Sequence, residues 1–386
     1  MRMLIAIVAV CCGLLGAPNT AHAADGVVPE PFRGFDPDSR KRITYENLDT
    51  LLGAVVADMG RSTREKAAPD HARTGTRMKT KVNPATVNEG NRFYFETFVD
   101  NEAAQATLRS IQEVLEQLPA QVPLASLNRD EQLAYWLNLY NVTVLNEIVA
   151  IYPRQDLKRI LEGKKSILAK KSLNVAGVPL SLDDIQFTIL RQNYDNNPLI
   201  IYGLYQGNIG GPNIRTRAYS GKDVYAALTE NAIEFINSNR GTAARNAQNF
   251  RVSSFYDRNR AYFPNFEADL TAHLLKYLEG DERAALQAAS TLKPDISDWT
   301  VTDLGGSRRE IGGSLALNNA ALMGSMSGSN AADSGGALGS SGGSAAGNLS
   351  PALARQMKER EAGQEENEDE DADEVPAEPG PTTEQN

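Results

Sequence analysis

Apolar residues recur at helical spacing in several stretches between residues 93 and 304. Leu108, Ile111 and Leu115 are three or four positions apart, which predicts an amphipathic helix from about 102 to 118. The same spacing predicts further helices at 48–59, 224–235 and 266–277, with Gly280 expected to end the last of them.

The longest predicted helix follows Asn128, a favoured N-cap residue with Glu131 three positions later. Pro153 is expected to close this helix after Tyr152. Residues 133–151 are apolar on nearly every side of the helix, so we expect it to be buried.

Shorter apolar runs predict strands. Residues 173–175 and 178–180 flank Ala176-Gly177, which indicates a hairpin whose proline keeps it at a sheet edge. The run 199–205 has the character of a strand and ends in the glycine-rich turn 207–212. The chain is therefore predicted to be a mixed α/β fold, dominated by helices, with a small β-sheet.

Two short motifs predict helix starts. Ser181-x-x-Asp184 has the form of a capping box, which opens a helix that runs to Arg191. Ser220-x-x-Asp223 is expected to cap the helix that follows it.

Composition divides the chain into four parts. We expect a signal peptide at 1–23, an N-terminal helical extension at 24–92 and a single globular core at 93–304. Residues 305–386 are rich in glycine and serine and then acidic, so this tail is predicted to be disordered.

The leader has the three parts of a secretory signal. Arg2 precedes an apolar run at 4–15, and small residues end in an A-x-A site at Ala23. The run is shorter than the roughly 20 residues that span a bilayer. No other stretch approaches this length, so no transmembrane segment is expected, and we predict export to the periplasm.

Cleavage at Ala23 would leave a chain poor in metal ligands. Cys11 and Cys12 are the only cysteines, and both belong to the leader, as does His22. His71 and His273 remain, so a zinc or haem site with several Cys or His ligands is excluded. We expect no metal and no cofactor.

Charge is concentrated in the tail. Residues 351–386 hold 12 acidic and 3 basic residues, a net charge of −9. The chain from residue 24 carries −11, so residues 24–350 carry only −2. Such a core has no electrostatic footprint for nucleic acid.

Several polar residues are candidates for ligand binding. Asn138 and Asn141 share one face of the long helix and either bind a ligand or brace nearby loop backbone. Arg191 either holds an anion or forms a structural ion pair. Tyr219 completes the predicted cleft with the glycine loop, represented by Gly207 and Gly211.

The glycine loop has two interpretations. Its backbone N–H groups could form a nest for an anion or oxyanion, or the loop could be a tight turn. Asp183 and Asp184 form a carboxylate pair that helix capping explains equally well. His273 lies beside Leu274 and is expected to pack in the last helix.

The motifs together resemble a known family. They are Tyr135-Trp136-Leu137-Asn138-Leu139-Tyr140-Asn141, Val175-Ala176-Gly177, Leu180-Ser181-Leu182-Asp183-Asp184-Ile185, Ile189-Leu190-Arg191, Pro212, Tyr219 and Asp298-Trp299. The first resembles the aromatic-Trp-x-Asn-x-Tyr-Asn signature of the domain-of-unknown-function 547 family, and the others resemble its central and closing blocks. The resemblance covers roughly residues 93–304.

Many members of that family resemble candidate cysteine hydrolases, with a Cys-Pro after a glycine-containing loop and a Glu-His in the capped helix. Gly211-Pro212 and Gln186-Phe187 stand at the matching positions here. Glycine has no nucleophile and phenylalanine accepts no proton, so the resemblance implies a non-catalytic version.

Three hypotheses follow. The first is a periplasmic binding or scaffold module, not an enzyme, for a small anionic or peptide-like ligand or a protein partner. The second is a hydrolase that uses a serine or an activated water, with His273 or a carboxylate as base and the glycine loop as oxyanion hole. The third is an interaction protein that binds through its tail.

Overall fold

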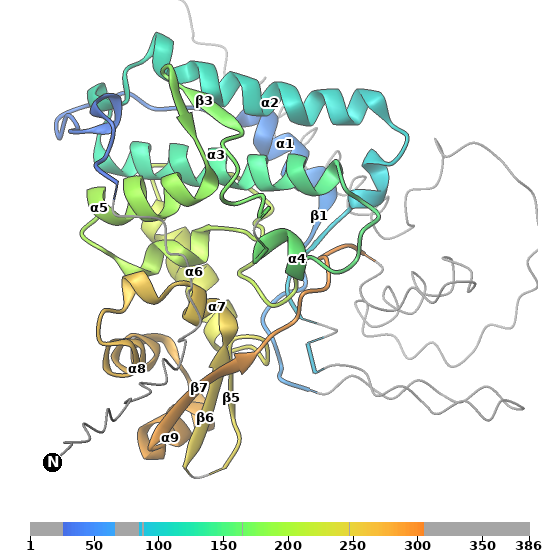
Figure 1. Cartoon of the computed structure of the whole chain (residues 1–386), viewed down its shortest axis with the longest axis vertical. Coiled ribbons are helices and arrows are strands. Elements are labelled where there is room, and N and C mark those ends of the chain that lie inside the picture. Colours follow the sequence, from blue (N-terminus) through green and yellow to red (C-terminus); the bar gives the residue numbers. More distant parts are fainter. Residues whose placement is uncertain (1–25, 66–84, 87–88, 164, 247, 305–386) are drawn as a thin grey trace, which may run out of the picture.

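The helices of the core are arranged around one long buried helix (Figure 1). Helix α2 (Glu102–Gln121) packs along α3 (Arg129–Val149), and the more C-terminal helices and a three-stranded sheet extend away from the other side of α3. The predicted signal peptide and tail lie outside the residues described. The computed structural model describes residues 26–65, 85–86, 89–163, 165–246 and 248–304.

Among these residues the α-helices outnumber the strands, which confirms the helix-dominated mixed fold. The helices are α1 (Glu46–Val55), α2 (Glu102–Gln121), α3 (Arg129–Val149), α4 (Lys158–Leu161), α5 (Arg191–Asn193), α6 (Val224–Ile236), α7 (Ser254–Arg258), α8 (Phe266–Tyr277) and α9 (Gly280–Ala288). The strands are β1 (Val56–Ala57), β2 (Arg92–Phe93), β3 (Leu173–Val175), β4 (Val178–Leu180), β5 (Thr242–Ala244), β6 (Asn249–Ser253) and β7 (Thr291–Ile296). A π-helix spans Asp184–Leu190, and 3-10 helices span Glu30–Phe32, Phe95–Phe98, Leu124–Ser126, Pro198–Gly203 and Arg260–Tyr262.

Helix α3 begins where the capping motif predicts. The Asn128 side chain accepts a hydrogen bond from the Glu131 N–H at 2.9 Å. The Glu131 carboxylate does not return to the cap but pairs with Arg42 and accepts the Ile43 N–H. Every residue of the helix from Leu133 to Leu145 is buried, as the apolar composition predicts.

The predicted hairpin is confirmed. Strand β3 pairs antiparallel with β4, with Leu173 opposite Leu180, and Ala176 and Gly177 turn the chain with positive φ. The second sheet has the order β5-β6-β7, in which β6 pairs antiparallel with β5 and parallel with β7. This sheet lies at the end of the molecule opposite α2 (Figure 1).

The strand predicted at 199–205 is wrong. This segment forms a 3-10 helix, Pro198–Gly203, whose first turn is capped by the Asn197 side chain at 3.0 Å from the Leu199 N–H. A short apolar run does not reveal its own period when every side chain is buried. A cap followed by proline at the first helical position decides for a helical turn here.

One predicted helix end and one predicted cap are also wrong. Helix α8 ends at Tyr277, and Gly280, with a φ of +59°, begins α9 instead of ending α8. Ser220 forms a turn before α6, in which the Asp223 N–H donates to the Ser220 carbonyl, and its side chain does not cap the helix. The capping box at Ser181 and Asp184 does form, with bonds of 3.1 Å and 2.6 Å in the two directions.

The described part of the N-terminal extension contains the 3-10 helix Glu30–Phe32, α1 and β1. Leu48 and Leu52 of α1 are buried against the core. In the part of the chain that the structure describes, no helix combines the length and the apolarity that crossing a bilayer requires.

Candidate functional site

The two asparagines of α3 each hold a piece of loop backbone. Asn138 donates to the Tyr219 carbonyl and accepts the Tyr219 N–H, both at 2.8 Å. Asn141 donates to the Gly203 carbonyl at 3.0 Å and accepts the Tyr205 N–H at 2.9 Å. Both side-chain amides therefore brace loops, which is the structural alternative that the sequence left open.

The same two residues also line a small pocket, the α1–α3 pocket, between helix α1, helix α3 and the loop before α6. Its volume is close to that of one water molecule. It is lined by Leu48, Leu52, Asn138, Asn141, Val142, Leu145, Ile214, Arg215, Arg217 and Tyr219.

Two arginines give this pocket its charge. Arg215 donates to Glu230 at 2.9 Å and lies over the Tyr219 ring, so its charge is compensated. Arg217 is exposed, and no carboxylate of the described residues lies within ion-pair distance of it. Tyr219 is buried, and burial raises the pKa of its hydroxyl above the usual value.

The glycine loop lies elsewhere and is closed. The N–H groups of Ile209 and Gly210 donate at 2.8 Å to the Thr300 and Asp298 carbonyls, and the Gly211 N–H donates to Asn208. All residues from 206 to 211 are buried. Of the two interpretations, the tight turn agrees with the structure, because the segment that follows β7 and Asn208 of the loop itself take up these donors.

Both glycines of interest fill tight spaces. Gly207 has a φ of +81°, and a Cβ built there would stand 1.9 Å from the Ile148 Cδ1 atom. At Gly211 a Cβ would approach Asn208 Oδ1 at 3.1 Å. Neither glycine lines the α1–α3 pocket.

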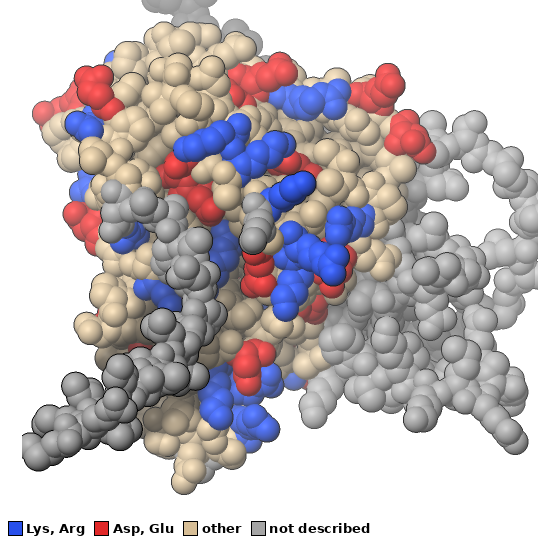
Figure 2. All heavy atoms as spheres, in the orientation of Figure 1, with Lys and Arg blue, Asp and Glu red and all other residues tan. Residues whose placement is uncertain are grey.

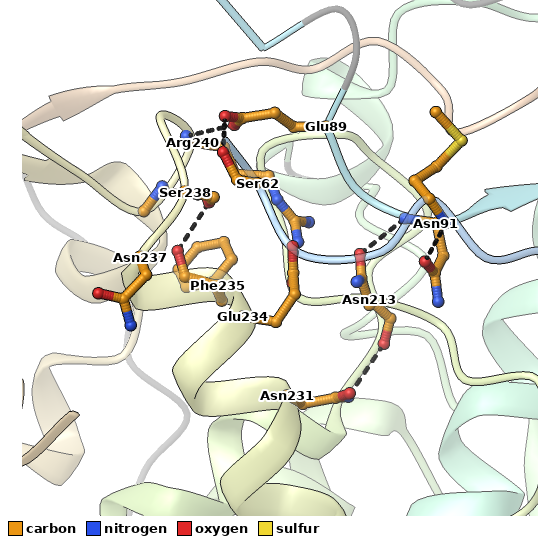
Figure 3. A network of polar contacts seen from close by, with 12 residues as sticks. Ser62, Glu89, Asn91, Asn213, Asn231, Glu234, Phe235, Asn237, Ser238 and Arg240 are labelled. Atoms are coloured by element: carbon orange, nitrogen blue, oxygen red, sulfur yellow. Dashed lines mark hydrogen bonds and ion pairs between the residues drawn. The ribbon is translucent and has the colours of Figure 1, made fainter. Parts of the chain in front are cut away.

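Beside the loop lies a network of buried charges centred on Arg240 (Figure 3). Its guanidinium donates to the Gly211 carbonyl at 2.6 Å and pairs with Glu234. The Arg240 backbone N–H donates to Glu89, which also accepts the Ser62 hydroxyl. Burial raises the pKa of Glu234, although the nearby Arg240 opposes this shift.

Arg92 adds a second buried cation. It is fully buried, and desolvation lowers its pKa to about 10 even though Asp303 and Asp298 favour the charged form. Asp303 accepts the Tyr152 hydroxyl at 2.9 Å. These charges compensate one another inside the fold, which is the pattern of a structural network.

Arg191, the remaining predicted site residue, lies away from both the α1–α3 pocket and the glycine loop. It starts α5, and its Nε donates to the Phe187 carbonyl at 3.0 Å. It does not line the α1–α3 pocket. The six predicted site residues therefore fall into three places, and only Asn138, Asn141 and Tyr219 come together.

His273 is a packing residue. Its Nε2 atom is 3.0 Å from the Tyr202 hydroxyl, and its ring stacks on the Tyr202 ring. Burial is the main cause that lowers the pKa of His273 to about 4. Among the described residues no serine is bonded to it, and no group of His, Cys, Asp and Glu is arranged to hold a metal ion.

A family model described as a protein of unknown function, DUF547, matches residues 124–236. This is a DUF547 domain-containing protein. The DUF547 match runs from before α3 to the end of α6 and contains all six predicted site residues. It is shorter than the resemblance expected at 93–304, and it leaves out Arg240 and Asp298. No curated protein and no solved structure matches the chain significantly.

Gln186 and Phe187 occupy the π-helix of the DUF547 domain. Gln186 is buried and donates to Asn259, while Phe187 packs near the Tyr262 ring. π-Helical turns are frequent at functional sites. Gln186 and Phe187 stand where the resemblance implies Glu and His, and neither an amide nor a phenyl ring acts as a general base.

Sequence reasoning missed Arg215, Arg217 and the Arg240 network. Each arginine is one of many in the chain, and no local motif marks it. Their positions depend on contacts between distant segments, such as the 151 positions between Glu89 and Arg240.

Proposed function

We propose that this DUF547 protein is a non-catalytic binding module that holds a small anionic ligand at the α1–α3 pocket. The observation that carries the non-catalytic part is the pair Gly211 and Phe187 at the positions where the resemblance implies Cys and His. The closed glycine loop supports it further, because the N–H groups of Ile209, Gly210 and Gly211 are bonded within the fold. Donors that are buried and already bonded do not stabilise an oxyanion.

The ligand class follows from the pocket. Half of its lining residues are aliphatic, and the amides of Asn138 and Asn141 are bonded to loop backbone. No carboxylate of the described residues pairs with Arg217 at the pocket, and its planar guanidinium suits a carboxylate or phosphate. Because the pocket itself has room for about one water molecule, the ligand would bind at its mouth, with a carboxylate or phosphate on the exposed Arg217 guanidinium.

Export is part of the proposal. The leader pattern at residues 1–23 supports it, and the binding module would then act in the periplasm. N-terminal sequencing of protein from the periplasmic fraction should start at Ala24. Protein that retains Arg2 in the cytoplasmic fraction would contradict export.

A thermal-shift screen tests the binding. The panel contains small carboxylates, amino acids, peptidoglycan fragments, sugar phosphates and uncharged sugars. A ligand present at 100 times its dissociation constant stabilises the native state by about 2.7 kcal/mol, so true binders raise the melting temperature. We expect small carboxylates and phosphates to do so, and uncharged sugars not to.

The matched variants are Arg217→Gln and Arg245→Gln, which each remove one exposed charge. Arg217→Gln should abolish the shift, and Arg245→Gln should leave it unchanged. A shift that survives Arg217→Gln would refute this pocket as the site. Turnover of any panel compound by the purified protein would refute the non-catalytic assignment.

A further inference from the structure

Basic residues gather around α4. Residues 154–171 hold seven Lys and Arg and only two acidic residues, Asp156 and Glu162. Figure 2 shows Lys and Arg side chains spread over the surface at α4. We define the α4 basic face by four exposed residues of this segment, Arg154, Lys158, Arg159 and Lys165.

The charges of the α4 basic face are uncompensated by the described residues. No carboxylate of this part of the chain lies within ion-pair distance of the four side chains. The neighbouring Lys170 and Lys171 differ, because they pair with Glu147 and Asp184. The α4 basic face is therefore a cationic surface open to an anionic partner.

The chain itself supplies an anionic segment. Nine of the 14 residues at 361–374 are acidic and none is basic, so this segment carries −9. Residues 24–350 have a net charge of only −2, so the α4 basic face is a local excess of positive charge. Its charge is opposite to that of the acidic segment. Complementary patches of this kind attract each other within a Debye length, about 8 Å at physiological salt.

The described chain also ends beside this face. The Leu157 N–H donates to the Trp299 carbonyl at 2.9 Å, and the Val301 N–H donates to the Gln155 carbonyl at 2.8 Å. Leu304, the last described residue, is three positions after Val301. Three residues span at most about 11 Å, so the continuation of the chain starts next to α4.

The connecting length is sufficient. From Leu304 to Glu361 there are 57 positions, through a stretch rich in Gly and Ser. For a Gly/Ser-rich composition of this length the expected root-mean-square span is roughly 40 Å. Tethering at this length gives an effective concentration approaching the millimolar range, which favours even a weak contact.

We propose that the acidic segment 361–374 docks on the α4 basic face of its own chain. The contact is electrostatic, made of several weak ion pairs, and it weakens as salt rises. It covers the α4 basic face with the protein's own carboxylates and leaves the α1–α3 pocket, on other elements, unaffected.

Carbodiimide cross-linking of the full chain tests this, because it joins a lysine amine only to a carboxylate in contact with it. Peptide mapping compares Lys158 and Lys165 with the exposed lysines Lys41 and Lys222. We expect links from 361–374 to Lys158 and Lys165 at about five times the yield of the reference lysines, falling to the reference level in 0.5 M salt. Equal yields at all four lysines, or no links, would overturn the proposal.

A pair of charge variants checks the face. Arg154→Gln/Arg159→Gln keeps both reporter lysines but removes two charges, so the links should fall at least about two-fold. Arg109→Gln/Arg245→Gln removes two exposed charges elsewhere and should leave the yield unchanged. An equal effect of both pairs would show that net charge, and not this face, holds the segment.

Mixing isotope-labelled and unlabelled protein separates the two possible origins of the links. Links within one isotopic species at all protein concentrations support docking within the chain. Links that join labelled to unlabelled peptides would overturn it, because they would show that a second copy supplies the acidic segment.

Discussion

Gly207 offers a clear test of whether the glycine loop is a structural element. The residue has a φ of +81°, and an added Cβ would stand 1.9 Å from Ile148 Cδ1 and 3.3 Å from Leu157 Cδ1. Left-handed backbone costs a residue with a Cβ about 1–2 kcal/mol. Overpacking a filled core costs about 1–3 kcal/mol more. Gly207→Ala should therefore lower the free energy of unfolding by roughly 2–5 kcal/mol.

Gly177→Ala is the matched control. Gly177 has nearly the same φ, +79°, but its added Cβ would meet no atom within 4 Å. This variant should lose only the backbone cost, about 1–2 kcal/mol. Urea unfolding of both variants separates the packing cost from the backbone cost.

A second substitution locates the clash. Ile148→Val removes the Cδ1 atom that the new Cβ would meet, so it should restore about 1–3 kcal/mol in the Gly207→Ala background. Alone, Ile148→Val should destabilise by about 0.5–1.5 kcal/mol. If the two changes simply add, or if Gly207→Ala costs no more than Gly177→Ala, the reasoning fails.

Three further predictions concern buried polar groups. Burial lowers the pKa of His273 from 6.5 to about 4, so between these pH values the folded state binds fewer protons than the unfolded state. The free energy of unfolding should therefore fall by up to about 3 kcal/mol as the pH drops from 6.5 to 4. Urea unfolding at several pH values should show a weaker pH dependence for His273→Phe. Asn141→Ala leaves two loop backbone groups unbonded and should cost about 2–4 kcal/mol in the same assay, whereas a role in ligand binding alone would leave stability unchanged. Glu234→Gln leaves the buried Arg240 guanidinium without its carboxylate and should lower the free energy of unfolding by about 3–5 kcal/mol. The double variant Arg240→Met/Glu234→Leu should lower it by less, and the opposite order would contradict a compensated structural pair.

Local signals predicted the elements whose cause is local. Helix α3, its Asn128 cap, the capping box at Ser181 and the β3–β4 hairpin depend on side chains within a few positions of the backbone they order. The DUF547 resemblance was visible for the same reason, since its most specific signature is the continuous segment 135–141 of α3.

The candidate site was only partly predictable. The sequence placed Asn138 and Asn141 on one helix face, and this follows directly from helical geometry. It did not show that both amides would be consumed by loop backbone, or that Arg217 would lie beside them at a pocket. Arg191 was grouped with them from the motif alone and lies elsewhere.

The sequence by itself determined where helix α3 starts, that this helix is buried, and that Gly211 and Phe187 carry no reactive side chain. Only the tertiary structure decided that the run after Asn197 is helical and that the glycine loop is closed by the segment at 298–300. The physical reason is the range of the interactions. Caps and periodicity act over a few residues, whereas the bonds that satisfy a buried N–H group come from any segment that folding brings beside it.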